Sequence, residues 1–257
     1  MGTLDGQVAV VTGSSRGIGH FMAREFAREG CNVVVAARSE EVRDPRLPGT
    51  IHSVAEELEA LGAQALAYRL DVTDDEQIAG CVEAAVERFG RIDILVNNAG
   101  VMAPAPIVEL PIRRFDLVMR INVRGPFAMT QAVLPTMLKQ GGGTVITISS
   151  GAADRAGAGN VSYAMSKIAV EKFTEGVAAE VGERGIRCFG LKPEGVVLSP
   201  GATYHGIPRA DLDTEDESDM GRAAIWLATA AEAAALNGRS FYSRALLREH
   251  PEARVDL

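Results

Sequence analysis

The chain has 257 residues, of which 47% are hydrophobic, and its formal net charge is −8 with a pI near 5.1. This composition provides enough apolar side chains for a large core and excludes an intrinsically disordered chain. The acidic balance argues against nucleic acid as a main partner, because such a partner requires a basic face. No apolar run reaches the roughly 18 residues that a membrane helix needs, so we expect no membrane insertion.

The N-terminal segment and the cysteines are typical of a cytoplasmic protein. Residues 1–6 lack the charged and apolar regions of a signal peptide. Cys31, Cys81 and Cys188 are far apart and form no C-x-x-C pair, which fits reduced thiols better than disulfides or zinc. The four histidines are scattered, so we expect no metal site.

A glycine-rich turn follows the first apolar run of the chain. Residues 7–12 are rich in β-branched side chains and predict a buried strand, and residues 20–29 have a helical pattern. Such a turn between a strand and a helix binds a dinucleotide pyrophosphate, because glycines let the backbone approach it and the helix N-terminus offers free N–H groups. The residues predicted to contact the cofactor here are Gly13, Ser15, Arg16, Gly17, Ile18 and Gly19.

The residues after the second predicted strand, 32–37, bear on the choice of cofactor. A site that prefers NAD usually places an acidic residue here, which binds the ribose hydroxyls. This chain has Arg38-Ser39 instead, and Arg38 with Arg16 could clamp a 2′-phosphate between two guanidinium groups. We therefore predict NADP(H); the alternative is that Arg38 only stacks on the adenine. The loop 40–50 is either a cofactor flap or a surface insertion.

Helical and strand patterns alternate along the rest of the chain. We predict helices over residues 51–62, 75–89, 113–140, 160–183 and 219–235, and strands over 64–70, 92–96, 143–149, 186–191 and 237–242. The long helix is expected to break near Asn122 and Pro126. The acidic run 211–219 is expected to be a solvated face or a lid over the substrate pocket. Residues 243–257 are expected to be a C-terminal tail without a motif.

This alternation, without a break in composition, predicts an α/β fold: a Rossmann-type, doubly wound parallel β-sheet in a three-layer α/β/α arrangement. We expect residues 1–257 to form a single dinucleotide-binding and catalytic domain. In such sheets ligands bind outside the carboxyl ends of the strands. The segments that fall at those ends are the glycine-rich turn, Asp71-Val72, Asn97-Asn98-Ala99-Gly100, Ser150 and Lys192-Pro193.

Tyr163 and Lys167 are four residues apart in the predicted helix 160–183, so both side chains would lie on one face. A lysine ammonium there would lower the pKa of the phenol from its ordinary value of about 10, which makes Tyr163 a candidate proton donor and acceptor. Ser150 follows the strand 143–149 and could point its hydroxyl at the same spot. The Y-x-x-x-K pattern alone is common in helices, and it gains weight from the convergence at the strand ends.

Together these motifs resemble the short-chain dehydrogenase/reductase family in its single-domain, NADP-preferring form, over roughly residues 5–242. The motifs are Thr12-Gly13-x-x-x-Gly17-x-Gly19, Asn97-Asn98-Ala99-Gly100, Asn122, Ser150 and Tyr163-x-x-x-Lys167. Residues 47–50 and 246–257 also resemble the reductase part of hydroxysteroid dehydrogenase-like proteins. The resemblance implies hydride transfer between a nicotinamide and a carbonyl or secondary alcohol.

The resemblance also implies a role for each matching residue. Tyr163 would be the acid/base, Ser150 would hold the carbonyl oxygen, and Lys167 would bind the nicotinamide ribose. Asn122 would anchor a water that relays protons to Lys167. The further cofactor contacts implied are Arg38, Ser39, Asp71, Val72, Asn98, Ala99, Gly100, Tyr163, Lys167, Pro193 and Val196. Members of the family are usually homotetramers or dimers.

Three features depart from the family pattern. The threonine that binds the carboxamide in relatives is replaced by Leu198, with Ser199 next to it, and Glu194 puts a carboxylate close to the site. The usual Asp-Gly-Gly after the last strand is absent, and residues 240–244 stand there instead. The insertion at 40–50 is the third departure.

The leading hypothesis is an NADPH-dependent ketone or aldehyde reductase that also runs in reverse as an alcohol dehydrogenase. One alternative is a 3-oxoacyl thioester reductase, against which the acidic run argues. Another is a non-catalytic NADP-binding regulatory or structural protein, since a fold alone does not fix function. The expected pocket walls, residues 102–110, 152–161 and 195–215, are mostly small or apolar and predict a hydrophobic small-molecule substrate without identifying it.

Overall fold

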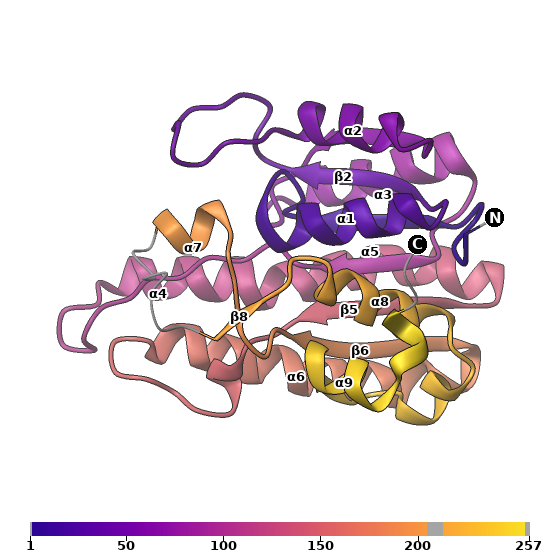
Figure 1. The fold of residues 1–257 in the computed structure, drawn as a ribbon. Helices are drawn as coiled ribbons and strands as arrows, with labels where there is room; N and C mark the ends of the chain where they lie inside the picture. The colour runs from indigo at the N-terminus through magenta and orange to yellow at the C-terminus, as the bar shows by residue number, and fades with distance from the viewer. Residues whose placement is uncertain (1, 205–212, 255–257) are drawn as a thin grey trace.

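The computed structural model describes residues 2–204 and 213–254. Its centre is a seven-stranded sheet in the order β3-β2-β1-β4-β5-β6-β9, in which every neighbouring pair is parallel (Figure 1). The strands are β1 (Val8–Thr12), β2 (Asn32–Ala37), β3 (Ala65–Arg69), β4 (Ile94–Asn97), β5 (Gly143–Ile148), β6 (Ile186–Lys192) and β9 (Ser240–Tyr242). The order reverses between β1 and β4, which is the switch point of a doubly wound sheet.

Helices cover both faces of the sheet, so the predicted fold class is confirmed. The helices α1 (Gly17–Arg28), α2 (Ile51–Ala60), α8 (Asp219–Thr229) and α9 (Ser243–Glu249) pack on one face, and α3 (Asp75–Phe89), α5 (Gly125–Gln140) and α6 (Val161–Val181) on the other. Successive strand residues point to opposite faces. In β1, Ala9 and Val11 belong to the first core and Val10 to the second.

Local signals in the sequence fix where several helices begin and end. Thr50 caps α2: its hydroxyl accepts a hydrogen bond from the backbone N–H of Ser53. The hydroxyl of Ser53 in turn accepts one from the backbone N–H of Thr50. Asp74 caps α3 by accepting hydrogen bonds from the backbone N–H groups of Glu76 and Gln77. That helix ends at Gly90, which has a φ of 77° that other residues rarely adopt.

The predicted break in the helix over 113–140 is confirmed. The segment consists of α4 (Ile112–Met119), a π-helical turn η1 (Arg120–Arg124) and α5. Asn122 lies in the π turn, and Pro126 follows it in the first turn of α5, where its missing N–H removes one hydrogen bond from the continuous helical segment. Such turns insert one residue and often mark functional sites.

The C-terminal part differs from the sequence-based expectation in two places. Residues 243–254 were expected to be a tail, but they form α9 and a 3₁₀ turn, η5 (Pro251–Arg254), and Leu246 and Leu247 are buried in the core. The acidic run was expected to be a solvated face, but Glu215 is only 4% exposed. Three hydrogen-bond donors stabilise its carboxylate in the interior. Residues 211 and 212, the first two of this run and of the proposed lid, lie outside the described residues.

All three cysteines are free and buried. Burial raises the pKa of each thiol, to about 12 for Cys81 and Cys188, and raises that of Cys31 as well. Within residues 2–204 and 213–254, the structure has no helix that is both long and apolar enough to cross a membrane.

Candidate active site and cofactor cleft

A cleft of about 390 Å³ opens at the carboxyl ends of β1, β2 and β4. The residues predicted to bind a cofactor that line it are Gly13, Ser15, Arg16, Gly17, Ile18, Arg38, Ser39, Asp71, Val72, Asn98, Ala99 and Gly100. Residues not predicted also line it, namely Ala37, Leu47, Leu70, Val101, Ile121, Ser199 and Tyr204. Leu47 belongs to the loop 40–50, which one of its two interpretations places at the cofactor, whereas no local pattern gives the place of Tyr204 in space.

The glycines of the turn are required by close backbone approach. Gly13 has a φ of 67°, and a Cβ there would lie 2.9 Å from the Cα of Ala99. A Cβ at Gly19 would lie 2.3 Å from Nδ2 of Asn98, which donates to the carbonyl of Thr12 at 2.8 Å. Gly19 is thus a packing residue and does not line the cleft. Larger side chains at either position would separate the two strand ends that frame the cleft.

The start of α1 leaves donors free for an anion. Arg16, its N-cap residue, makes no side-chain cap, and the first turn holds no acidic residue. The first N–H groups of a helix have no partner within it, so a phosphate at this end would receive hydrogen bonds and a favourable dipole. The backbone of the chain therefore fits the pyrophosphate of a dinucleotide.

Arg16 and Arg38 both line this cleft. Burial and the nearby Arg38 guanidinium lower the pKa of Arg16, so the two cations lie close enough to repel each other. Within the described part of the chain, Arg38 pairs with Asp71 at 4.0 Å, and its side chain is 61% exposed. A pair of partly desolvated guanidinium groups is a site for a phosphate dianion.

The loop 40–50 folds back over the glycine-rich turn. Arg16 donates to the carbonyls of Pro48 and Gly49, at 3.1 and 3.0 Å, and to the hydroxyl of Ser39. The guanidinium of Arg46 in turn lies 4.7 Å from the ring centroid of Tyr204 in α7 (Pro200–Tyr204). In Figure 1 this loop and α7 lie at the same end of the sheet, beyond the end of β2.

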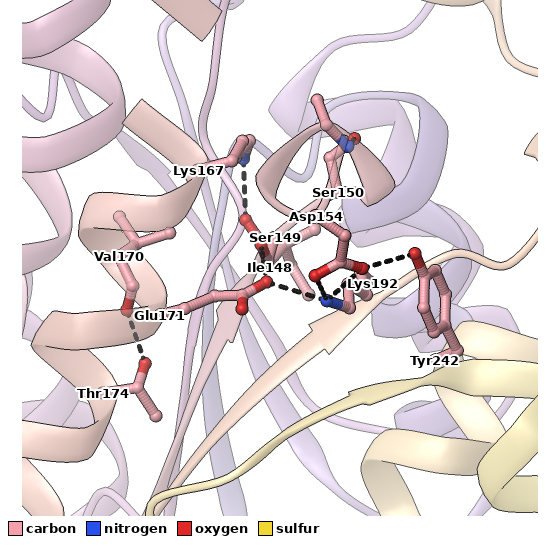
Figure 2. A network of polar contacts seen from close by, with 11 residues as sticks. Ile148, Ser149, Ser150, Asp154, Lys167, Val170, Glu171, Thr174, Lys192 and Tyr242 are labelled. Atoms are coloured by element: carbon pink, nitrogen blue, oxygen red, sulfur yellow. Dashed lines mark hydrogen bonds and ion pairs between the residues drawn. The ribbon is translucent and has the colours of Figure 1, made fainter. Parts of the chain in front are cut away.

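Tyr163 and Lys167 lie on one face of α6, as their spacing predicts. The ammonium of Lys167 is 5.4 Å from the ring centroid of Tyr163, and the residue is 5% exposed. Its Nζ donates to the carbonyl of Ile148 at 2.7 Å, two residues before Ser150 (Figure 2). The structure therefore brings the tyrosine, the lysine and the loop of the serine together.

Asn122 connects this group to the cofactor cleft. Its side chain exchanges two hydrogen bonds with the backbone of Val101, which lines the cleft, and donates to Oγ of Ser166 at 3.0 Å. Ser166 donates to the carbonyl of Tyr163 at 2.7 Å. The amide of Asn122 thus fixes the turn of α6 that carries Tyr163, and its role in holding a water stays a prediction.

The segment 193–199 places its residues differently from the family pattern. Pro193 and Val196 do not line the cleft, whereas Ser199 does and lies 3.4 Å from where a Cβ of Gly17 would be. The carboxylate of Glu194 pairs with Arg248 of α9 at 3.0 Å. Its charge is therefore engaged by the C-terminal helix.

A polar network that the sequence did not predict lies behind the loop of Ser150 (Figure 2). Its centre is Lys192, whose ammonium contacts Asp154 at 2.8 Å and Glu171 at 3.1 Å. Tyr242 donates its hydroxyl to Asp154 at 2.6 Å. That hydrogen bond raises the pKa of Tyr242 to about 12, because ionisation would set two anions side by side. The only signal in the sequence is a lysine at the end of an apolar strand.

A second cluster anchors the segment after β6. The buried carboxylate of Glu215, in β8 (Thr214–Glu215), accepts from the backbone N–H groups of Glu194 and Gly195 and from the hydroxyl of Ser243. Burial raises the pKa of Glu215. β8 pairs with β7 (Val196–Val197) as a small separate ribbon. The residues that replace the family's Asp-Gly-Gly therefore hold this segment.

Comparison with known proteins agrees with this geometry. A family model described as short chain dehydrogenase matches residues 7–204. The 7alpha-hydroxysteroid dehydrogenase of Escherichia coli is 37% identical over 196 residues, covering 76% of this chain and 73% of that protein. Hydroxysteroid dehydrogenase-like protein 2 of Bos taurus is 43% identical over 148 residues, which are 58% of this chain and only 35% of the relative.

Solved structures show the same fold. A 7 alpha-hydroxysteroid dehydrogenase complexed with NADH and 7-oxo glycochenodeoxycholic acid has a TM-score of 0.81 at 31% identity, covering 93% of each chain. A short-chain type dehydrogenase/reductase from Mycobacterium marinum has a TM-score of 0.80 at 30% identity, covering 93% of this chain and 94% of that one. The motifs, the sheet order and these matches agree: the chain belongs to the short-chain dehydrogenase family of oxidoreductases.

Proposed function

We propose that this protein is an NADPH-dependent reductase of hydrophobic ketones or aldehydes, reversible as an alcohol dehydrogenase. The observation that carries the proposal is the group formed by Tyr163, Lys167 and the Ser150 loop, which Asn122 connects to the cofactor cleft. A cluster of this kind within a family of oxidoreductases fits proton transfer to a carbonyl oxygen better than a purely regulatory role.

Each residue of the group has a separate task. Tyr163 gives its phenolic proton to the carbonyl oxygen during reduction and takes it back in the reverse direction. Ser150 donates a hydrogen bond to the same oxygen, because among the described residues its hydroxyl donates to no other acceptor. Lys167 holds a positive charge beside the phenol. A bound nicotinamide supplies or accepts the hydride.

The cleft supports NADP(H) as the cofactor. Arg16 and Arg38 offer two guanidinium groups where the 2′-phosphate of the adenosine ribose would lie, with Ser39 directly after Arg38 in the sequence. The loop 40–50 would then be a cofactor flap, because Arg16 already binds its backbone. Since one structurally similar relative is complexed with NADH, the preference has to be measured.

The decisive experiment combines cofactor titration with one variant. NADPH should bind the purified protein more tightly than NADH, and Arg38→Asp should shift the preference toward NADH. Tyr163→Phe should lower turnover of a ketone by about 10²- to 10⁴-fold while NADPH binding is retained. Tyr68→Phe, which removes a phenol on β3 away from the cleft, is the matched control. Unchanged turnover in Tyr163→Phe would exclude the assigned role.

We also propose that the protein is a homo-oligomer, a dimer or tetramer, in the cytoplasm. Exposed apolar side chains on α5 and α6 support the assembly, and the main ones are Phe127, Met165 and Ile168, at 53%, 46% and 50% exposure. The three buried free thiols fit a reducing compartment. Light scattering after size-exclusion chromatography tests the assembly, and Ile168→Glu should lower the measured mass.

A further inference from the structure

A buried lysine lies at the end of β6, behind the loop that carries Ser150. Lys192 is 5% exposed, and its Nζ lies 2.8 Å from each carboxylate oxygen of Asp154 and 3.1 Å from Oε1 of Glu171 (Figure 2). A charge is retained in the interior only when it is paired and hydrogen-bonded. The two carboxylates therefore account for the burial of Lys192, and they come from two different elements.

Both carboxylates act on the short segment around Ser150. On one side, Ser149 donates its hydroxyl to Oε1 of Glu171 at 2.6 Å. On the other side, Asp154 is the residue directly after the 3₁₀ turn η2 (Gly151–Ala153), and Ser150 is the residue directly before it. Lys192 thus holds the residue before the serine, through Glu171, and the residue after the turn, through Asp154.

Tyr242 completes the clamp from β9. Its hydroxyl donates to Asp154 at 2.6 Å, and Nζ of Lys192 lies 4.7 Å from its ring centroid. A Cβ at Gly151 would lie 3.2 Å from the Tyr242 hydroxyl, so the phenol packs directly over the turn. Three strands and a helix therefore meet at this one turn.

We propose that Lys192 is a positioning residue for Ser150. The inference rests on the proposed function, in which Ser150 donates a hydrogen bond to the carbonyl oxygen. Without the ammonium, Asp154 and Glu171 would repel each other, and the two anchors of the turn would move apart. Because a displacement of about 1 Å can lower a rate by about a hundredfold, a looser turn would impair the reaction although Lys192 touches no substrate.

Backbone hydrogen exchange tests the clamp without any substrate. Lys192→Met should raise the exchange rate of amides in residues 149–155 by about tenfold, because the turn opens locally, and leave residues 12–19 unchanged. Lys172→Met is the matched control, since this lysine of α6 pairs with Glu175 at the exposed surface. Unchanged exchange over 149–155 would overturn the proposal. A wild-type protein that reduces no carbonyl would count against the proposed function alone, because the exchange result stands without turnover.

Kinetics then separate positioning from general damage to the fold. Lys192→Met should lower kcat/KM about tenfold or more, with the Kd for NADPH within about twofold of wild type. In a Ser150→Ala background the same substitution should lower kcat/KM by no more than about twofold, because the positioned hydroxyl is gone. Equal losses in both backgrounds would overturn the proposal.

A second variant keeps the test decisive if Lys192→Met does not fold. Asp154→Asn preserves the shape of the side chain, removes one of the two charges, and leaves Glu171 to pair with Lys192. It should raise exchange over 149–155 and lower kcat/KM, each by about threefold, again only when Ser150 is present. Wild-type values for both quantities in this variant would overturn the proposal.

Discussion

Two sites lie at the carboxyl ends of the parallel strands and are built differently. The cofactor cleft lies at the ends of β1, β2 and β4, and the polar network lies at the ends of β5, β6 and β9. At the cleft, the key positions are glycines: Gly13 lines the cleft, Gly19 packs against Asn98, and a Cβ at either would collide with a neighbour. In the network around Lys192, and in the second cluster around Glu215, charged and hydroxyl side chains join segments that are distant in the sequence.

This difference decides how each region tolerates substitution. A glycine in a left-handed conformation admits no other residue without strain, so the cleft is intolerant at a few positions that lie close together in the sequence. A side-chain network distributes its hydrogen bonds over many partners, but loss of one buried charge leaves its partners unpaired. The predictions below test each half of the comparison.

The largest effect is expected at Gly13. In Gly13→Ala, the φ of 67° and the 2.9 Å approach to Ala99 would act together, so NADPH affinity should fall about a hundredfold or more. Fluorescence titration measures it. Gly6→Ala is the matched control, since Gly6 has a φ of 73° with no atom within 4 Å of its Cβ position. It should lose some stability and no affinity; equal loss of affinity in both would contradict the role of close approach.

A smaller effect is expected at Glu215. Glu215→Ala leaves the N–H groups of Glu194 and Gly195 without their acceptor, so the free energy of unfolding should fall by about 2–3 kcal/mol. Asp213→Ala, which breaks an ion pair with Arg244 at an exposed carboxylate, should lower the free energy of unfolding much less. Urea unfolding of both variants makes the comparison.

The raised pKa of Glu215 should also make the stability of the protein depend on pH. Burial raises this pKa in the folded state, so the folded protein holds this proton more tightly than the unfolded chain. Stability therefore falls as pH rises from the unfolded pKa, about 4.5, through the raised folded value. Glu215→Gln should remove that slope, and a slope identical to wild type would show that another group causes it.

Tyr242→Phe should lower the free energy of unfolding moderately, by an amount that decreases at alkaline pH. The neutral phenol donates to Asp154, and the folded pKa of Tyr242 is raised to about 12, above the ordinary value of about 10. Its contribution, about 1 kcal/mol, is present below pH 10 and lost as pH rises toward 12. The difference in unfolding free energy between wild type and variant should therefore shrink over this range. A constant difference would show that the hydroxyl does not donate to a carboxylate.

The smallest effect is expected at Arg46, which is exposed and contacts Tyr204 across the cleft. Arg46→Ala should speed NADPH dissociation about threefold, because one contact between the loop 40–50 and α7 is lost. Stopped-flow displacement measures the rate, and Arg43→Ala, in the same exposed loop, is the control. If both variants release NADPH at the wild-type rate, the loop is a surface insertion and not a flap.

The sequence predicted the elements that local patterns specify. Strand patterns that alternate with helical ones predicted all seven strands of the main sheet, and Asn122 with Pro126 marked the helix break. The spacing of Tyr163 and Lys167 placed them on one helix face. These features depend on residues close together in the chain, where periodicity and backbone preference decide the structure.

The network was not predicted because its partners are distant in the sequence. Lys192 and Asp154 are 38 residues apart, and Tyr242 and Asp154 are 88 apart. No pattern in one sequence pairs such residues; the parallel pairing of β5, β6 and β9 in the sheet brings them together. The same holds for Glu215. Its position in an acidic run predicted a solvated carboxylate, but the side chain is buried and accepts hydrogen bonds from three donors.

The rates at which the three buried cysteines are alkylated report when each part of the molecule opens. Cys31 directly precedes β2, Cys81 lies in α3, and Cys188 lies near the start of β6. Only a thiolate is alkylated readily, and burial opposes its formation at all three sites. Each thiol therefore reacts only when its surroundings unfold, and the order in which the three are labelled reports which part of the molecule loosens first.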